Sequence, residues 1–334
     1  MPPGNYRKLR IFSPRCFDSF CHICTDIMQA LFDRSPSFSF EFFPPKTPQG
    51  AESLLETVIQ LQEFHPSFVS VTYGAGGSSR GLTRAVVHDI QSRGIPTVPH
   101  LTCVGHTEAE IEEILEGYIG AGARAIMVLR GDPPRHMEYD PGADAFRHAA
   151  DLVRFIRRWE DRQHLSTPLT LGVAGFPEGH PDSRNRLKEM DYLKAKIDEG
   201  ADYICTQLFF DNHAFFDFRD RCRLMDIDVP IIAGIMPVTT ISGMNRMAEL
   251  SAGTNFPARL LKAMLRAGGD KASLERIGIN YASNQCSELL DAEVDGIHFY
   301  TLNRSKATLE IYHNLGFNNY FDLERLRSLN NLYR

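Results

Sequence analysis

From residue 36 onward, short runs of β-forming residues alternate with longer segments whose apolar positions recur every three or four residues. This alternation is typical of βα units, in which helices join parallel strands. Eight strands are predicted, at residues 37–43, 68–73, 97–103, 125–130, 169–174, 203–209, 230–235 and 296–301. Eight units over roughly 300 residues, without an internal linker, indicate an α/β fold of the (β/α)8 TIM barrel type rather than an open doubly wound sheet.

The helical periodicity is clearest at residues 51–64 and 107–119. The second of these segments opens with the capping box Thr107-x-x-Glu110, which predicts where its helix begins. Residues 241–287 form an interval too long for one crossover. We expect two or three extra helices there, between strands 7 and 8, with a break at Gly268-Gly269-Asp270.

Polar and glycine-rich residues follow every predicted strand. In a (β/α)8 barrel the carboxyl ends of the strands form the active face, so these residues are expected to meet at one mouth. They are Glu41, Thr72 to Gly77, His100 to Cys103, Arg130 to Pro134, Phe176 to Pro181, Thr206 to Asp211, Met236 with Pro237, and Tyr300 to Arg304.

The first strand carries the most suggestive of these residues. Its sequence is Phe38-Ser-Phe-Glu-Phe-Phe-Pro-Pro-Lys46, with aromatic residues at period two and a proline pair that ends the strand. A carboxylate among aromatic rings loses solvation, which favours its protonated form, as a general acid requires. We therefore expect Glu41 to be buried and catalytic. The alternative is an edge strand on which Glu41 faces water.

Composition narrows the class of protein. The chain has 36 Lys and Arg against 42 Asp and Glu, a net charge of −6, which argues against a nucleic-acid or anionic-membrane partner. No apolar run approaches the roughly 20 residues of a membrane helix. Seven cysteines do not make a disulfide scaffold in a chain of 334 residues, so a cytoplasmic location is expected.

Residues 1–35 differ from the rest. They are basic at first and lack the apolar segment and cleavage site of a secretory signal. We expect an N-terminal extension that is disordered or not native, with Met28 as an alternative start, followed by a single catalytic domain at 36–334. The pair Cys21 and Cys24 has metal or redox spacing, yet an isolated pair is more often incidental.

Other motifs carry weak signals. The glycines between Gly74 and Gly77 lack the spacing of a dinucleotide fingerprint and suit a tight loop. His100 and His180 lack the paired spacing of metal ligands, so no metal is expected and a hydrogen-bonding role at the mouth is favoured.

Eight ordered motifs together resemble one family. They are Phe-Glu-Phe-Phe-Pro-Pro-Lys, Val-Ser-Val-Thr-Tyr-Gly-Ala, Pro-His-Leu-Thr-Cys, Leu-Arg-Gly-Asp, Pro-Glu-Gly-His-Pro, Thr-Gln-Leu-Phe-Phe-Asp, Gly-Ile-Met-Pro-Val and His-Phe-Tyr-Thr-Leu-Asn-Arg. From residue 38 to about 316 the chain resembles methylenetetrahydrofolate reductase of the bacterial catalytic-domain type. The resemblance implies that the chain ends with the catalytic domain.

The activity that the resemblance implies is reduction of 5,10-methylenetetrahydrofolate to 5-methyltetrahydrofolate, in one-carbon metabolism and methionine supply. FAD would carry hydride from NADH or NADPH to the folate by a ping-pong route, in a homo-oligomer. Glu41 matches the general acid, and Asp132 matches the aspartate that stabilises a cationic folate iminium and tunes the flavin. The folate substrate would meet Glu41, Thr72, Asp132, Gln207 and Arg304.

The same matching places thirteen residues around the cofactor: Thr72, Tyr73, Ala75, His100, Arg130, Gly131, Asp132, Ala149, Phe176, His180, Ser183, Glu189 and Lys196. Two of them depart from the usual residue, since Phe176 replaces a tyrosine and Glu189 replaces an aspartate. Gly243 and Met247 stand where a glutamine and a phenylalanine normally touch substrate.

Two alternatives stay open at this point. One is a non-catalytic or altered-specificity paralogue that binds flavin or folate, which the changes at Gly243 and Met247 support. The other is a metal- or Schiff-base-dependent lyase on the same barrel, against which no strand end supplies a lysine.

Overall fold

Eight parallel strands close into a barrel, and each strand is hydrogen-bonded to its neighbours in chain order. The structure, a computed structural model, describes residues 36–73, 80–133, 142, 144–181, 183, 185–251 and 254–332. The strands are β1 (Ser37–Phe42), β2 (Phe68–Val71), β3 (Thr97–Thr102), β4 (Ala125–Leu129), β5 (Thr170–Gly175), β6 (Tyr203–Thr206), β7 (Ile231–Ile235) and β8 (Gly296–Tyr300). β1 also pairs with β8, which closes the barrel. The predicted (β/α)8 fold is confirmed.

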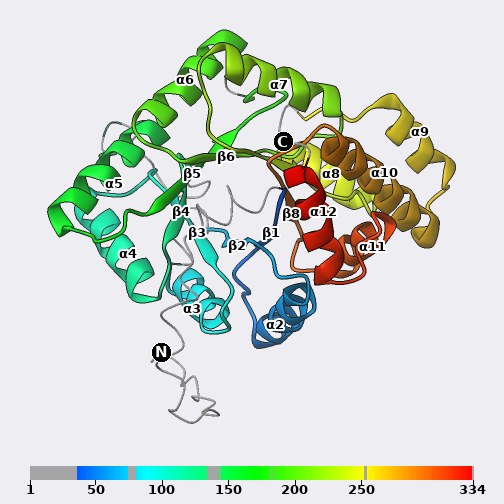
Figure 1. Ribbon diagram of the computed structural model, residues 1–334, viewed down its shortest axis with the longest axis horizontal. Coiled ribbons are helices and arrows are strands. Elements are labelled where there is room, and N and C mark those ends of the chain that lie inside the picture. The colour runs from blue at the N-terminus through cyan, green and yellow to red at the C-terminus, as the bar shows by residue number, and fades with distance from the viewer. Residues whose placement is uncertain are drawn as a thin grey trace.

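Helices surround the ring of strands (Figure 1). They are α2 (Pro48–Gln62), α3 (Arg80–Gln91), α4 (Glu108–Gly120), α5 (Ala149–Gln163), α6 (Arg186–Asp198), α7 (Asn212–Leu224), α8 (Ile241–Leu250), α9 (Ala258–Arg266), α10 (Lys271–Asp291), α11 (Lys306–Asn314) and α12 (Tyr320–Leu332). The predicted capping box opens α4. The Thr107 hydroxyl accepts a hydrogen bond from the backbone N–H of Glu110, and the Glu110 carboxylate accepts one from the backbone N–H of Thr107.

Three helices, α8 to α10, lie between β7 and β8, as the length of that interval predicts. The break at Gly268-Gly269-Asp270 separates α9 from α10, and both glycines have positive φ. Asp270 then caps α10 by accepting a hydrogen bond from the Ser273 backbone. The glycines therefore end one helix, and the aspartate begins the next.

Alternation along the strands produces two buried layers. Side chains facing outward, such as Phe40, Val128 and Ile204, join a large core with the surrounding helices. Side chains facing inward fill the lumen of the barrel, where one group is apolar: Phe68, Val98, Ala125, Met127, Tyr203, Cys205 and Ile232. We call this group the apolar cluster. Successive side chains of a strand point to opposite faces, so each strand contributes to both layers.

The predicted strand boundaries differ from the observed ones by up to three residues. β1 ends at Phe42 rather than Phe43, because both backbone groups of Phe43 are hydrogen-bonded to the side chain of Asn303. The Phe43 nitrogen donates to Oδ1 of Asn303 at 2.8 Å, and the Phe43 oxygen accepts from Nδ2 at 2.9 Å. β2 ends at Val71 and β6 at Thr206, so more of the predicted strand residues lie in mouth loops.

Among the described residues, no helix combines the length and the apolar character needed to cross a membrane. Residues 1–35, where the sequence predicts an extension with Cys21 and Cys24, lie outside the described residues.

Candidate active site

Glu41 lies near the carboxyl end of β1, and only 7% of it is exposed. The expectation of burial is confirmed, and the edge-strand alternative is wrong because β1 pairs on both sides. The expected surroundings are also wrong. Phe38 and Phe40 point outward, where the Phe38 ring lies 5.5 Å from that of Tyr312 on α11, whereas Glu41 points into the lumen. Period-two alternation alone requires this separation.

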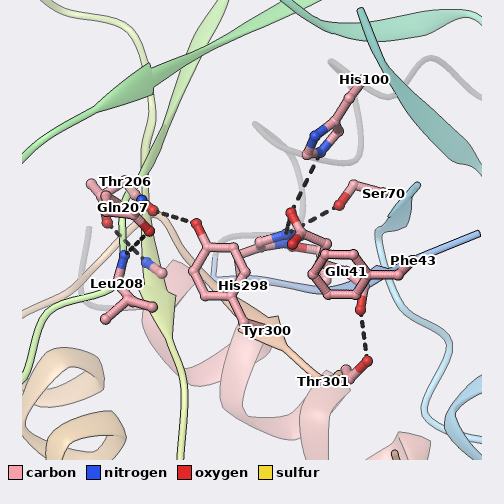
Figure 2. A network of polar contacts seen from close by, with 12 residues as sticks. Glu41, Phe43, Ser70, His100, Thr206, Gln207, Leu208, His298, Tyr300 and Thr301 are labelled. Carbon is pink, nitrogen blue, oxygen red and sulfur yellow. Dashed lines mark hydrogen bonds and ion pairs between the residues drawn. The ribbon is translucent and has the colours of Figure 1, made fainter. Parts of the chain in front are cut away.

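Two imidazoles lie beside Glu41 in the lumen, and two hydroxyl groups contact one of these imidazoles. Oε2 of Glu41 lies 3.5 Å from Nε2 of His100 on β3 and 3.9 Å from Nε2 of His298 on β8. His298 Nδ1 lies 2.7 Å from Ser39 Oγ, and its Nε2 lies 3.3 Å from Ser70 Oγ. Figure 2 shows Glu41 between His100, Ser70 and His298. We call these five residues the polar cluster.

Burial controls the charge of His100. Loss of solvation lowers the pKa of His100, the Glu41 carboxylate partly opposes this effect, and the nearby His298 adds to it. The direction is downward from the ordinary value, so His100 is a neutral imidazole at neutral pH. It can hydrogen-bond Glu41 or a ligand without adding a positive charge.

The wall beside Glu41 is built by the end of β8. Tyr300 donates a hydrogen bond to the backbone oxygen of Thr206 at 2.7 Å (Figure 2). Burial raises the pKa of Tyr300 well above its ordinary value, so it stays a donor. Thr301 donates to the backbone oxygen of Glu41 at 2.6 Å. Gln207 follows Thr206, and its backbone nitrogen donates to Gly175 at 2.7 Å, which holds it at the mouth.

The loop after β4 packs against the end of β3. Gly131 has a φ of +81°, and a Cβ there would lie 2.7 Å from Cβ of Thr102, so both conformation and space require glycine. The flanking Arg130 and Asp132 are exposed. The structure therefore presents a cation and an anion at the mouth above the strand that carries His100.

The region after β5 gathers several predicted cofactor residues. Lys196 of α6 donates to the backbone oxygen of Ala174 at 2.6 Å, and burial lowers the pKa of Lys196 to about 8 against the raising effect of Glu189. Among the described residues, no donor pairs with the buried Oε1 of Glu189. The rings of Phe176 and His180 meet edge to face, 4.7 Å apart. A polar ligand could donate a hydrogen bond to the buried Oε1 of Glu189 and stabilise the charged form of Lys196, which burial disfavours.

The remaining predicted residues lie at or beside other strand ends. The Thr72 backbone nitrogen donates to Phe42, and the Tyr73 hydroxyl lies 2.9 Å from Nε2 of His106. Three residues occupy helix starts or mouth loops: Ala149, Ser183 and Arg304. Ala75 lies outside the described residues. Asp132 and Arg304 are exposed and lie in the loops after β4 and β8.

Sequence reasoning missed His298, Ser39 and Ser70. Alternation in β8 places His298 and Tyr300 on the inward face, a signal that could have found the imidazole but not its partner.

A groove of about 500 Å³ on the described surface, lined by Arg259, Arg276 and Tyr281 among others, contains none of the predicted site residues. Across the described ranges, no group of His, Cys, Asp and Glu is arranged to hold a metal ion.

Comparison with known proteins identifies the family. The family model described as methylenetetrahydrofolate reductase matches residues 26–316. The chain belongs to the methylenetetrahydrofolate reductase family. The 5,10-methylenetetrahydrofolate reductase of Escherichia coli K12 is 35% identical over 280 residues, which are 83% of this chain and 90% of that reductase.

Longer reductases match over part of their length. Methylenetetrahydrofolate reductase 1 of Schizosaccharomyces pombe is 36% identical over 84% of this chain and 46% of its own. Methylenetetrahydrofolate reductase (NADH) 1 of Arabidopsis thaliana is 36% identical over 84% of this chain and 48% of its own. The chain thus spans about half the length of these two eukaryotic reductases.

A solved structure shares the fold at lower identity. It is an uncharacterized protein from Clostridium thermocellum, described as binding two copies of 5-methyl-5,6,7,8-tetrahydrofolic acid. The TM-score is 0.59 at 15% identity, over 86% of this chain and 95% of that one. At this identity the similarity to the Clostridium thermocellum protein establishes the barrel fold alone.

Proposed function

We propose that this protein reduces 5,10-methylenetetrahydrofolate to 5-methyltetrahydrofolate with FAD and NADH or NADPH. The observation that carries the proposal is the buried Glu41 between two imidazoles at the barrel mouth, in a chain of this family. A proton donor held out of water beside an open mouth is what opening of the folate's five-membered ring requires. The name of the Arabidopsis relative specifies NADH, which favours that nucleotide as the first to test.

The residues fit a flavin dinucleotide. The buried Oε1 of Glu189 needs a donor, which the hydroxyls of a ribityl or ribose group can provide. Lys196 and Arg130 offer positive charge to a pyrophosphate, and an anion there would restore the charged form that burial of Lys196 disfavours. When bound, the flavin would supply the two-electron redox chemistry between nicotinamide and folate.

The chain's own residues would act on the folate. Glu41 would hold the proton that its carboxyl group donates at the N10 side of the substrate, which opens the ring to a cationic iminium. The exposed carboxylate of Asp132 would stabilise that cation. Gln207 would contact the pterin, and the exposed guanidinium of Arg304 suits the glutamate carboxylate of the folate.

Gly243 and Met247 bear on the alternative that the protein is a non-catalytic or altered-specificity paralogue. Met247 is 5% exposed and packs in an apolar group with Leu208 and Met236, so its side chain is part of the core. Gly243 lies in the first turn of α8, where its backbone donates to Thr240. These observations favour altered contacts to folate or nicotinamide, while the polar cluster argues for retained chemistry.

An anaerobic two-step experiment tests the proposal. Protein loaded with FAD should be yellow, lose its colour with NADH or NADPH, and regain it when 5,10-methylenetetrahydrofolate is added. Protein that binds FAD but is not reoxidised by the folate would support the non-catalytic paralogue. Failure to bind FAD would refute the proposal. The homo-oligomer that the resemblance implies and the cytoplasmic location that the cysteine content indicates stay predictions. Light scattering would check the first.

A further inference from the structure

His298 is a buried imidazole to which the proposed reaction gives no role so far. It lies one layer below Glu41 in the lumen, next to Ser39 in the β1–β8 register, and only 2% of it is exposed. Its ring is stacked on Phe68, with centroids 5.8 Å apart and planes at 20°, and meets Tyr300 edge to face at 5.4 Å. These contacts fix the plane of the ring, so its two nitrogens have fixed directions.

The two nitrogens have different partners. Nδ1 points to the hydroxyl of Ser39 at 2.7 Å, and Nε2 points to the hydroxyl of Ser70 at 3.3 Å and to Oε2 of Glu41 at 3.9 Å. If the Ser39 hydroxyl donates to Nδ1, the neutral imidazole carries its proton on Nε2. That N–H can donate to Ser70 Oγ, and it lies beside the carboxyl group of Glu41. In the other tautomer the lone pair of Nε2 would face the lone pairs of Oε2, which is repulsive when the proton of the carboxyl group is on Oε1.

We propose that His298, with its tautomer set by Ser39, is a positioning residue: its Nε2–H, bound to Ser70 and 3.9 Å from Oε2 of Glu41, attracts that oxygen electrostatically and leaves Oε1 to carry the transferable proton. His100 approaches the same Oε2, at 3.5 Å, so both imidazoles flank one oxygen of the carboxylate. The other oxygen is the atom that delivers the proton to substrate. This inference rests on the proposed folate reduction for its kinetic consequence, whereas its geometry stands on the contacts alone.

Two substitutions separate the nitrogens of His298. A glutamine side chain reaches the place of Nε2 and can still donate toward Glu41, whereas asparagine reaches only the place of Nδ1 and keeps the contact with Ser39. H298N should slow reoxidation by folate about 10²-fold, as expected when a catalytic group is misplaced by about 1 Å. H298Q should retain clearly more of that rate. Reduction by nicotinamide should be unchanged in both variants.

Equal rates for H298N and H298Q, or parallel losses in both half-reactions, would overturn the proposal, because a merely structural histidine would act on folding and cofactor content. S39A provides a milder variant if neither folds. It should slow the folate step by less than H298N does and leave nicotinamide oxidation intact.

The tautomer can be observed without activity. In protein labelled with ¹⁵N-histidine, the His298 signals should show an unprotonated Nδ1 and a protonated Nε2, and E41Q should shift the Nε2 signal more than the Nδ1 signal. A proton on Nδ1 would refute the assignment. If wild-type protein fails to reduce the folate, the proposed function is wrong, but this spectrum still decides whether Ser39 and Glu41 hold His298 as described.

Discussion

The lumen of this barrel holds two buried groups of opposite chemistry. The polar cluster has hydrogen-bonding side chains from β1, β2, β3 and β8, whereas the apolar cluster is centred on β4, β6 and β7 and includes Tyr203 and Ile232. The two groups meet where Phe68 stacks on His298. In most (β/α)8 barrels bulky aliphatic residues dominate the lumen, so the polar cluster departs from the pattern on one side.

The difference indicates that the two clusters have different roles, one in the chemistry of the site and the other in the stability of the barrel. Each member of the polar cluster is held by directed contacts between strands that are far apart in the chain, such as Ser39 and His298, 259 residues apart. Members of the apolar cluster need only fill space. We therefore expect changes in the polar cluster to act on individual chemical steps, and changes in the apolar cluster to act on stability and on all steps together.

Replacement of Glu41 by glutamine should have the largest effect. The change keeps the size of the side chain and removes the proton donor, so reoxidation by folate should fall about 10²- to 10⁴-fold. Reduction by NADH should survive, because it needs no such proton. Anaerobic stopped-flow measurement of each half-reaction checks this. E310Q, the same change at a half-buried carboxylate on α11, is the matched control, and an equal loss in both half-reactions of E41Q would refute the role.

Truncation of Ile232 to alanine tests the apolar side of the comparison. Ile232 is fully buried in the lumen, so the cavity should cost about 2–5 kcal/mol of unfolding free energy. Both half-reactions of the folded fraction should keep their ratio. L224A removes an aliphatic side chain that is 84% exposed and should change stability by less than about 0.5 kcal/mol. Chemical denaturation measures both. A selective loss of the folate step in I232A would contradict the division of tasks.

Lys196 predicts a pH dependence of the free energy of unfolding. Its folded-state pKa is lowered to about 8 from an ordinary value of 10.5, so between these pH values the unfolded chain binds more protons than the folded one. Stability of the ligand-free protein should therefore gain from this residue as pH rises from about 8 to 10.5. K196M should lose that gain, and K188M, at an exposed lysine, should retain it. Denaturation at several pH values gives the slope of unfolding free energy against pH for each protein. Identical slopes in all three proteins would contradict a lowered pKa of Lys196 in the folded state.

Local sequence patterns predicted most of the fold because they depend on neighbours in the chain. All eight strands, the capping box of α4 and the break before Asp270 are local features of this kind. The ends of β2 and β6 were predicted too far along because apolar residues such as Leu208 and Phe209 continue past the strand into the core. Composition alone cannot show where ladder hydrogen bonds stop.

The candidate site was predictable only in part. Placement of Glu41 at the end of β1 followed from its strand. Its predicted surroundings were wrong, because alternation puts the neighbouring phenylalanines on the opposite face of the strand. The contact with His298 depends on barrel closure, since β1 and β8 meet only when all eight strands are in register. No local pattern specifies that register, so Ser39 and His298 could not be paired in advance.

Removal of the Tyr300 hydroxyl should have the smallest effect and tests the junction between the two groups. Tyr300 extends from the strand of His298, and its hydroxyl donates to Thr206 on β6, the strand that contributes Tyr203 to the apolar cluster. Y300F keeps the ring and leaves one backbone acceptor unpaired, which should cost about 1 kcal/mol. Thermal unfolding should show a midpoint lower by about 1–2 °C. Because the ring still meets His298 edge to face, the folate step should change little; a loss as large as that of H298N would show that this hydroxyl, rather than the imidazole, orients the carboxylate.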